Sequence, residues 1–394
     1  MSSRAIASDK HTRPQADVLL LVIAGALLCA GLVIMTSASI SLAERNNGAP
    51  LFYLERQVLA AALGLAGAWC MWRIPTEIWA RIGLLLVIGA VALLVIVLVP
   101  GFGHTVNGST RWLNIGGVSL LQVSEPARLL MLMYISGYAV RHAAELRRHF
   151  LGFLKPMLLI GVVCGLLLAQ PDFGAAVVML IITLAVLFIG GARLRDFLVF
   201  STAVASALLA LAVSSPYRMA RITAFLDPWA DPYNSGFQLT QSLIAIGSGE
   251  WFGVGLGSSV QKLFYLPEAH TDFVFAVIAE EFGLVGSVLL IALFSALVWR
   301  ALEISRESAL CGRLYQSHLA FGFAIWQGVQ VFINIGVNMG ILPTKGLTLP
   351  LISYGRSSLI VTLIGLGLLL RIDRENRELA AESSSRRSKR RRAG

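Results

Sequence analysis

Apolar residues in this 394-residue chain occur in long runs that are separated by shorter polar segments. Most runs cover roughly 15–25 residues, the length that an α-helix needs to cross a hydrocarbon core of about 30 Å. The pattern therefore predicts an all-α polytopic membrane protein with about ten transmembrane helices. The predicted helices are Val18–Thr36, Val58–Trp72, Ile82–Val99, Pro126–Val140, Pro156–Ala169, Gly174–Ile189, Phe197–Val213, Asp272–Trp299, Leu319–Met339 and Ser357–Leu370.

Composition and charge placement agree with this prediction and orient the helices. The mean hydropathy is +0.74 and only 14% of the residues are charged, against about 25% in soluble domains. With the N-terminus inside, most of the 32 Lys and Arg residues fall on the inner side, as the positive-inside rule requires. We therefore expect cytoplasmic tails at residues 1–16 and 372–394, and one membrane domain over residues 17–371.

Two longer polar segments are predicted on the outer side. The first is Pro100–Glu125. The second, an extracytoplasmic loop at about residues 214–271 between the seventh and eighth helices, is rich in Pro, Gly and aromatic residues. That composition is typical of an ordered loop rather than of a flexible linker. Within it, the apolar spacing of Phe237–Ile246 predicts a short helix on the membrane surface.

The net charge of +10 comes largely from Arg and Lys residues near the C-terminus. In a membrane protein such a cluster binds anionic lipid headgroups and fixes the topology. Docking of a partner protein is the alternative. We expect no nucleic-acid ligand.

Asp272 is the first candidate for chemistry because it is a carboxylate at the mouth of an apolar helix. Ionisable groups in that position are costly and usually functional. Ala276 and Ala279 follow on the same helical face and predict a crevice lined by small side chains. Glu280 and Glu281 lie deeper, and we interpret both as structural residues that bind neighbouring helices.

Other polar groups complete the picture of the outer side. The predicted outer cations, with glycine-rich stretches such as Gly253–Gly257 nearby, would suit a bulky anionic ligand, although each cation alone is typical of an interface residue. His270 either contacts the ligand or has a simple loop role. Glu125 and Arg128, spaced i, i+3, predict a structural ion pair within one helix. The chain contains no H-E-x-x-H, G-x-S-x-G or P-loop motif.

Several longer motifs are similar to those of the SEDS family (shape, elongation, division, sporulation), and most of all to its cell-division members. The resemblance runs over nearly all of residues 15–375. The motifs are Q-P-D-F-G at 170–174, F-L-D-P-W-A-D-P-Y-N-S-G-F-Q-L-T-Q-S at 225–242, V-Q-K-L-F-Y-L-P-E-A-H-T-D-F at 260–273, L-P-T-K-G-L-T-L-P at 342–350 and S-Y-G-R-S-S at 353–358.

The resemblance implies a ten-span peptidoglycan glycosyltransferase that polymerises lipid II on the outer face of the bacterial cytoplasmic membrane, at the division septum. The family's essential aspartate corresponds to Asp272, and its Glu–Lys pair to Glu125 and Arg128. Arg356 departs from the family, which usually has glycine there. An arginine adds bulk and charge beside the expected cavity, or supplies a phosphate contact.

The chemistry of that reaction is compatible with these residues. An α-linked diphosphate donor and a β-1,4 product require inversion, and therefore a base on the attacking hydroxyl. We predict that Asp272 is the general base. The predicted substrate-binding residues are Arg111, Arg221, Lys262, His270, Lys345 and Arg356. Diphosphate leaves as a stable anion, so cations can replace an acid. No organic cofactor is expected; a divalent cation, Mg²⁺ or Mn²⁺, held by Asp272 is the mechanistic alternative.

Two other functions use the same residues differently. A lipid II flippase would employ the cavity and cations for transport, and a non-catalytic divisome scaffold would need no reactive carboxylate. A polymerase without transpeptidase motifs requires a separate cross-linking enzyme. The resemblance implies that this partner is a class B penicillin-binding protein, together with other divisome proteins.

Overall fold

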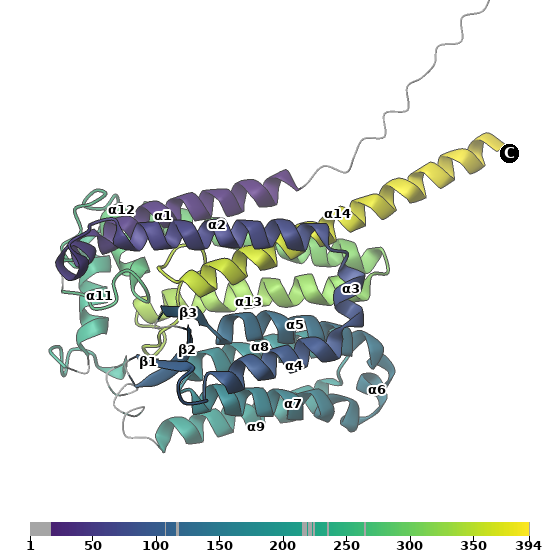
Figure 1. Ribbon diagram of the computed structural model, residues 1–394, viewed down its shortest axis with the longest axis horizontal. Helices are drawn as coiled ribbons and strands as arrows, with labels where there is room; N and C mark the ends of the chain where they lie inside the picture. The colour runs from purple at the N-terminus through teal and green to yellow at the C-terminus, as the bar shows by residue number, and fades with distance from the viewer. Residues whose placement is uncertain are drawn as a thin grey trace, which may run out of the picture.

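The computed structural model describes residues 17–106, 108–115, 118–214, 219, 223, 225–234, 236–263 and 265–393. The long helices lie side by side in one bundle, and α14 extends beyond it at the end where α1 begins (Figure 1). The opposite end carries a small β-sheet and α11, which runs at a steep angle to the long helices of the bundle (Figure 1). The helices of the first half are α1 (Val18–Asn47), α2 (Phe52–Arg73), α3 (Thr76–Arg81), α4 (Gly83–Ile96), α5 (Ser124–Arg141), α6 (Ala143–Arg148) and α7 (Phe150–Ala169). Those of the second half are α8 (Phe173–Ile189), α9 (Leu194–Val213), α11 (Phe237–Ser248), α12 (Val274–Leu310), α13 (Leu314–Asn338) and α14 (Arg356–Ala393).

Each of the ten predicted apolar ranges overlaps one of these helices. In the described part of the chain, α1, α7, α12 and α13 are long and apolar enough to cross a membrane by length and composition, and α4 and α8 are shorter apolar helices. The chain is therefore a predominantly helical membrane protein, as the hydropathy pattern predicts.

A three-stranded antiparallel sheet in the predicted outer segment corrects the all-α prediction. The strands are β1 (Gly103–Val106), β2 (Ser109–Ile115) and β3 (Val118–Gln122), in the order β1-β2-β3. Trp112 pairs with Gln122, and Gly108 has a φ of 76°, which allows the tight turn between β1 and β2. Strands of four to seven residues are too short to appear in a pattern of long apolar runs.

The predicted eighth helix is also corrected, at its start and in its middle. Helix α12 begins at Val274, so Asp272 lies in the preceding loop rather than inside the helix. At Gly283 (φ 65°, ψ −161°) the helical geometry is interrupted. A single glycine therefore divides α12 into a short segment that follows Asp272 and a long one.

Backbone groups released by this interruption bond to the preceding loop. The Val254 and Gly255 N–H groups donate to the carbonyl oxygens of Glu280 and Glu281, at 2.9 and 3.1 Å. In return, the Leu284 N–H donates to the Glu250 carbonyl at 2.9 Å. These bonds satisfy polar backbone groups that lipid could not.

One glycine of the 253–257 stretch serves this contact. A Cβ placed on Gly253 would lie 2.2 Å from the Glu281 carbonyl oxygen. Gly253 therefore permits close approach of two backbones. Within the described residues, a Cβ on Gly255 or Gly257 would meet no neighbouring backbone.

We predict that Gly283→Ala destabilises the protein strongly. The backbone region of Gly283 is accessible essentially to glycine alone, at a cost of about 1–3 kcal/mol for another residue. The added Cβ would also lie 2.4 Å from the Gly253 nitrogen. We expect the thermal unfolding midpoint in detergent to fall by several degrees or more. Gly247→Ala in α11, where a Cβ meets nothing within 4 Å, is the control; equal midpoints for the two variants would contradict this account.

Helix α14 continues to Ala393, well past the predicted end of the last span at Leu370. Ion pairs one turn apart support this extension, including Arg371–Glu375 at 2.7 Å and Arg374–Glu378 at 2.8 Å. At the same end of the bundle Arg300 of α12 pairs with Asp17 at 2.5 Å and Asp373 at 3.2 Å. This buried arginine ties the start of α1 to α12 and α14.

Candidate functional site

Asp272 lies half-buried in the loop before α12. Its carboxylate faces the loop between α13 and α14, because a Cβ on Gly346 would lie only 2.8 Å from Asp272 Oδ2. Gly346 itself is exposed. The contact brings two of the recognised motifs, 260–273 and 342–350, to one point on the surface.

Two amides of α13 hold the backbone of Asp272. Asn334 Nδ2 and Asn338 Nδ2 donate to the Asp272 carbonyl oxygen at 2.9 and 3.0 Å. Asn338 Oδ1 accepts the Ala276 N–H at 3.1 Å. These asparagines are not among the residues predicted from the sequence, although polar residues four apart in an apolar helix are a usable signal.

The 345–348 loop is fixed by the same face of α13. Asn334 Nδ2 also donates to the Leu347 carbonyl at 2.6 Å, and Gln330 Nε2 donates to the Thr348 carbonyl at 3.0 Å. Lys345 Nζ lies 4.4 Å from the ring centroid of Phe173, a cation–π distance. Burial lowers the pKa of the Lys345 ammonium below the ordinary lysine value.

The Q-P-D-F-G motif forms the support of this loop. Asp172 caps α8 by accepting the Ala175 N–H at 3.1 Å, and Phe173 then lies beneath Lys345. Arg111 Nη2 donates to the Pro171 carbonyl at 2.5 Å, and Arg111 Nε lies 3.9 Å from Asp172 Oδ2. The structure thus connects Arg111, Lys345 and Asp272 through adjoining segments.

An aromatic cluster surrounds His270, two residues before Asp272. The His270 ring centroid lies 5.1 Å from that of Tyr53 and 5.8 Å from that of Tyr354, in tilted arrangements. The Tyr354 N–H donates to the His270 carbonyl at 2.8 Å. Burial lowers the pKa of His270, so its imidazole is neutral at pH 7. Arg356 follows as the first residue of α14 and is half-buried. His270 therefore contributes to a built surface that connects the Asp272 loop with the segment leading to Arg356.

Lys262 is engaged within the fold, and its predicted substrate contact stays a prediction. Its buried ammonium pairs with Glu281 at 2.8 Å and donates to Ser37 Oγ of α1 at 3.0 Å. Glu280 accepts the Val260 N–H at 3.0 Å and the Ser259 hydroxyl. The structural interpretation of both glutamates is confirmed, but Glu280 binds the 259–261 loop and not a neighbouring helix.

The last predicted residues are the ion pair Glu125–Arg128, which is confirmed, and Arg221. Both Glu125 carboxylate oxygens lie 3.3 Å from Arg128 Nη1, and both residues are buried. Arg128 Nη1 also donates to Gln330 Oε1 at 3.2 Å, so the predicted ion pair exists and contacts the polar face of α13. Arg221 lies outside the described residues.

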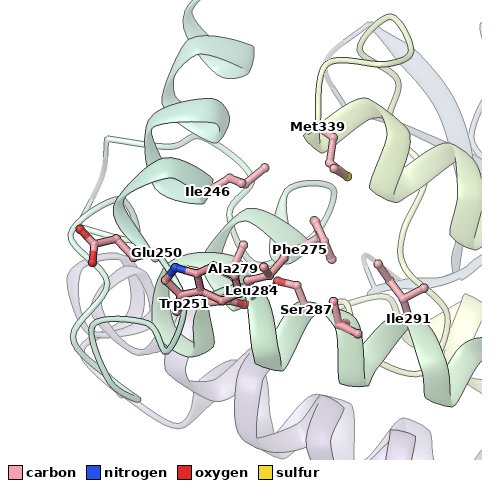
Figure 2. Close-up of a pocket in the computed structure, with 11 residues that line it drawn as sticks. Ile246, Glu250, Trp251, Phe275, Ala279, Leu284, Ser287, Ile291 and Met339 are labelled. Carbon is pink, nitrogen blue, oxygen red and sulfur yellow. Dashed lines mark hydrogen bonds between the residues drawn. The ribbon is translucent and has the colours of Figure 1, made fainter.

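An apolar cavity of about 490 Å³ occupies the interruption of α12. Figure 2 shows Ile246 of α11 and Met339 facing it across from Phe275 and Ala279 of α12. Ala279 lines this cavity, whereas Ala276 is fully buried and does not, and Asp272 is not among the lining residues. The crevice is therefore displaced from the carboxylate and suits hydrocarbon rather than a charged group.

The carboxyl, imidazole and thiol groups of the described residues form no cluster of three or more that could hold a metal ion. Mg²⁺ often binds one or two carboxylates together with substrate phosphates. Asp272 fits that mode, with a phosphate-bearing substrate as the second ligand. This arrangement would not require a preformed protein cage.

Comparisons with known proteins agree with the motifs. Residues 17–378 match the family model of the FtsW/RodA/SpoVE cell cycle proteins. A relative from Thioalkalivibrio sulfidiphilus, named a probable peptidoglycan glycosyltransferase FtsW, is 57% identical over 90% of this chain and 88% of its own length. A solved peptidoglycan synthase complex that coordinates polymerization and crosslinking contains a chain with 34% identity and a TM-score of 0.76, covering 92% of this chain and 98% of that one. The rod shape determining protein RodA of Thermus thermophilus is 32% identical, with a TM-score of 0.67 and coverage of 92% and 97%.

Proposed function

Because this chain belongs to the FtsW/RodA/SpoVE family of cell cycle proteins, we propose that it is a peptidoglycan glycosyltransferase that polymerises lipid II into glycan strands. The observation that carries the proposal is the Asp272 carboxylate, presented at an exposed glycine beside Lys345. A carboxylate and a cation on adjoining loops are the minimum set that an inverting transfer from a diphosphate donor requires.

In this proposal Asp272 is the general base. Its carboxylate takes the proton of the acceptor sugar's 4-hydroxyl while that oxygen attacks the anomeric carbon of the donor. The bond from that carbon to the diphosphate breaks, and undecaprenyl diphosphate departs with the electron pair. The carbon inverts, which turns an α-linked donor into a β-1,4 linkage.

The leaving diphosphate needs positive charge rather than a proton. Lys345 and Arg111 supply it on the Phe173 side, and Arg356 on the side of the aromatic cluster. Arg356 also has the advantage of the first position of α14, where a helix N-terminus favours anions. Lys262 is omitted because Glu281 already neutralises it, and Arg221 remains a proposal from the sequence.

A divalent cation is compatible with this arrangement. Asp272 would hold Mg²⁺ or Mn²⁺ jointly with the diphosphate, and the ion would add charge stabilisation to the leaving group when bound. Asp272 would still take the proton of the hydroxyl, and Lys345 would still contact the diphosphate.

The proposal includes a topology. Ten helices cross the cytoplasmic membrane, with residues 1–16 and 372–394 inside and the loop at about 214–271 outside, where α11 lies on the membrane surface. The basic residues of the inner segments support this orientation. It presents Asp272 to the face on which glycan strands grow.

The proposal also includes partners and a place. The chain has no transpeptidase motif, so its strands need a separate cross-linking enzyme, which we propose is a class B penicillin-binding protein. The similar chain in a synthase complex that couples polymerization to crosslinking supports this pairing. With other divisome proteins, the pair would act at the division septum.

The direct test is to supply lipid II to the purified full-length chain, with no other polymerase, and to separate the products by gel electrophoresis. The cross-linking partner is added in a parallel reaction. Glycan strands in either reaction are the expected result. Lipid II movement across vesicles without strand synthesis would indicate a flippase instead, and neither activity would indicate a scaffold.

The lowered pKa of Lys345 predicts an unusual alkaline limit of activity. Lys345 is cationic below its pKa and neutral above it, so diphosphate stabilisation is lost as pH rises through that value. Because burial lowers the pKa, kcat/KM should decline below the ordinary lysine pKa of about 10.4. Lys345→Arg, which stays charged, should move the limit to higher pH, whereas the exposed Lys155→Arg should not. If the alkaline limit of kcat/KM were unchanged in Lys345→Arg, Lys345 would not be the group that stabilises the diphosphate.

A further inference from the structure

We infer that Asn334 and Asn338 are positioning residues, which hold Asp272 in the orientation that proton transfer requires. The inference rests on the proposed function, because it takes Asp272 as the base. Neither asparagine would touch the substrate; each acts through the backbone that carries the carboxylate.

The backbone at Asp272 requires an external support. Asp272 lies before the first helical residue of α12, so the helix does not determine its orientation. Two amide donors from α13, at 2.9 and 3.0 Å, occupy its carbonyl oxygen. A carbonyl has two lone pairs, and both are used. Asn334 is 2% exposed and Asn338 is 0% exposed, so water does not compete with these bonds.

Asn338 also holds the chain after Asp272. Its Oδ1 accepts the Ala276 N–H at 3.1 Å. That N–H lies in the first turn of α12 and also donates to the Phe273 carbonyl at 3.1 Å, so Asn338 supplies it with a second acceptor. One side chain therefore fixes the backbone at both ends of the segment 272–276, and with it the direction of the Asp272 side chain.

Asn334 sets the separation of the two reactive loops. Its two amide hydrogens go to different segments, one to the Asp272 carbonyl and one to the Leu347 carbonyl at 2.6 Å. Leu347 is adjacent to Gly346, which faces the carboxylate, and one residue further lies Lys345. A single planar amide thus places the base relative to the cation.

The cost of these side chains supports a role in the reaction. Burying an amide inside an apolar helix is unfavourable unless its hydrogen bonds are made. Both amide nitrogens and Asn338 Oδ1 are bonded, whereas the buried Asn334 Oδ1 has no hydrogen-bond partner within the described residues. Leucine would fit the same helix without that cost. Asn338 is further anchored because its own carbonyl accepts the Ser242 hydroxyl of α11 at 2.8 Å. The asparagines are thus rigid supports rather than mobile contacts.

The test compares Asn338→Leu and Asn334→Leu with wild type in steady-state polymerisation of lipid II. A misplacement of about 1 Å costs about 100-fold, so we expect kcat to fall roughly 10- to 100-fold while KM changes less than about threefold. Gln327→Leu is the matched control. Gln327 lies on the same helix and is buried, and its side-chain atoms have no hydrogen-bond partner within the described structure. Its kcat should equal that of wild type.

A double variant separates positioning from general destabilisation. Gly346→Ala displaces the same carboxylate, so in combination with Asn338→Leu the loss should be smaller than the product of the single losses. Should Asn338→Leu not accumulate, Asn338→Ser, whose short hydroxyl cannot span both contacts, replaces it.

The outcomes are distinct. Wild-type kcat in folded Asn338 and Asn334 variants, with Asp272→Asn inactive, overturns the positioning inference and leaves the proposed function intact. Losses that multiply in the double variant also overturn it. Full activity of Asp272→Asn would instead overturn the proposed function itself.

Discussion

Asp272→Asn should abolish lipid II polymerisation while the protein still folds and binds its substrate. The amide has the shape of the carboxylate but cannot accept the hydroxyl proton, and general-base catalysis contributes about 10²–10⁴-fold. Asn334 and Asn338 hold this loop through the backbone carbonyl of Asp272, so the substitution leaves these two hydrogen bonds in place. We expect strand synthesis to fall by about 1,000-fold, with lipid II binding within about threefold of wild type.

The neighbouring Glu268 offers a matched control. It lies four residues before Asp272, is exposed, and accepts the Thr271 hydroxyl at 2.6 Å, which glutamine can also do. Glu268→Gln should polymerise lipid II at the wild-type rate. If Asp272→Asn polymerised equally fast, the carboxylate would not be the base, and if it slowed lipid transfer across the bilayer instead, the flippase alternative would replace the enzyme.

A single methyl group at Gly346 should be nearly as damaging. The Cβ of Gly346→Ala would lie 2.8 Å from Asp272 Oδ2, so the carboxylate or the loop must move. Gly346 does not have a positive φ, hence alanine fits the backbone and the effect is confined to this contact. We expect kcat to fall about 100-fold with the thermal unfolding midpoint nearly unchanged, measured on the same purified sample.

Gly165→Ala is the comparison for this variant, because a Cβ there meets nothing within 4 Å in α7. Its kcat should match wild type. Wild-type activity of Gly346→Ala would mean that the Asp272 carboxylate does not act as the base in its observed position beside this loop. Loss of activity accompanied by a large fall in the unfolding midpoint would point to a folding defect instead.

The bundle was predictable because a bilayer imposes a simple rule. Every backbone polar group inside it needs an internal partner, so long apolar runs become helices, as those from Val18 to Leu370 do. The same rule made Asp272 conspicuous, since a carboxylate beside an apolar helix is costly. The sequence motifs around Asp272 then indicated the family. Helical periodicity alone could not have indicated it.

Contacts between distant segments were beyond this rule. Lys262 was predicted to bind substrate because it is an outer cation that follows a glycine-rich stretch, yet its ammonium pairs with Glu281, 19 residues further along the chain. No local pattern distinguishes a lysine that pairs internally from one that faces solvent. The interruption at Gly283 was likewise hidden, because its free carbonyls are satisfied by residues of an earlier loop.

By itself the sequence determined a helical membrane protein, its likeness to one family and a single aspartate suited to act as a base. Hydropathy and motif spelling are local properties, and they survive in any arrangement of the helices. The tertiary structure decided which cations stay near that aspartate, which glycine leaves room for its carboxylate and which amides hold it. These contacts depend on which helix faces pack together. Buried polar groups bond to the groups nearest in space, which are often distant in the sequence.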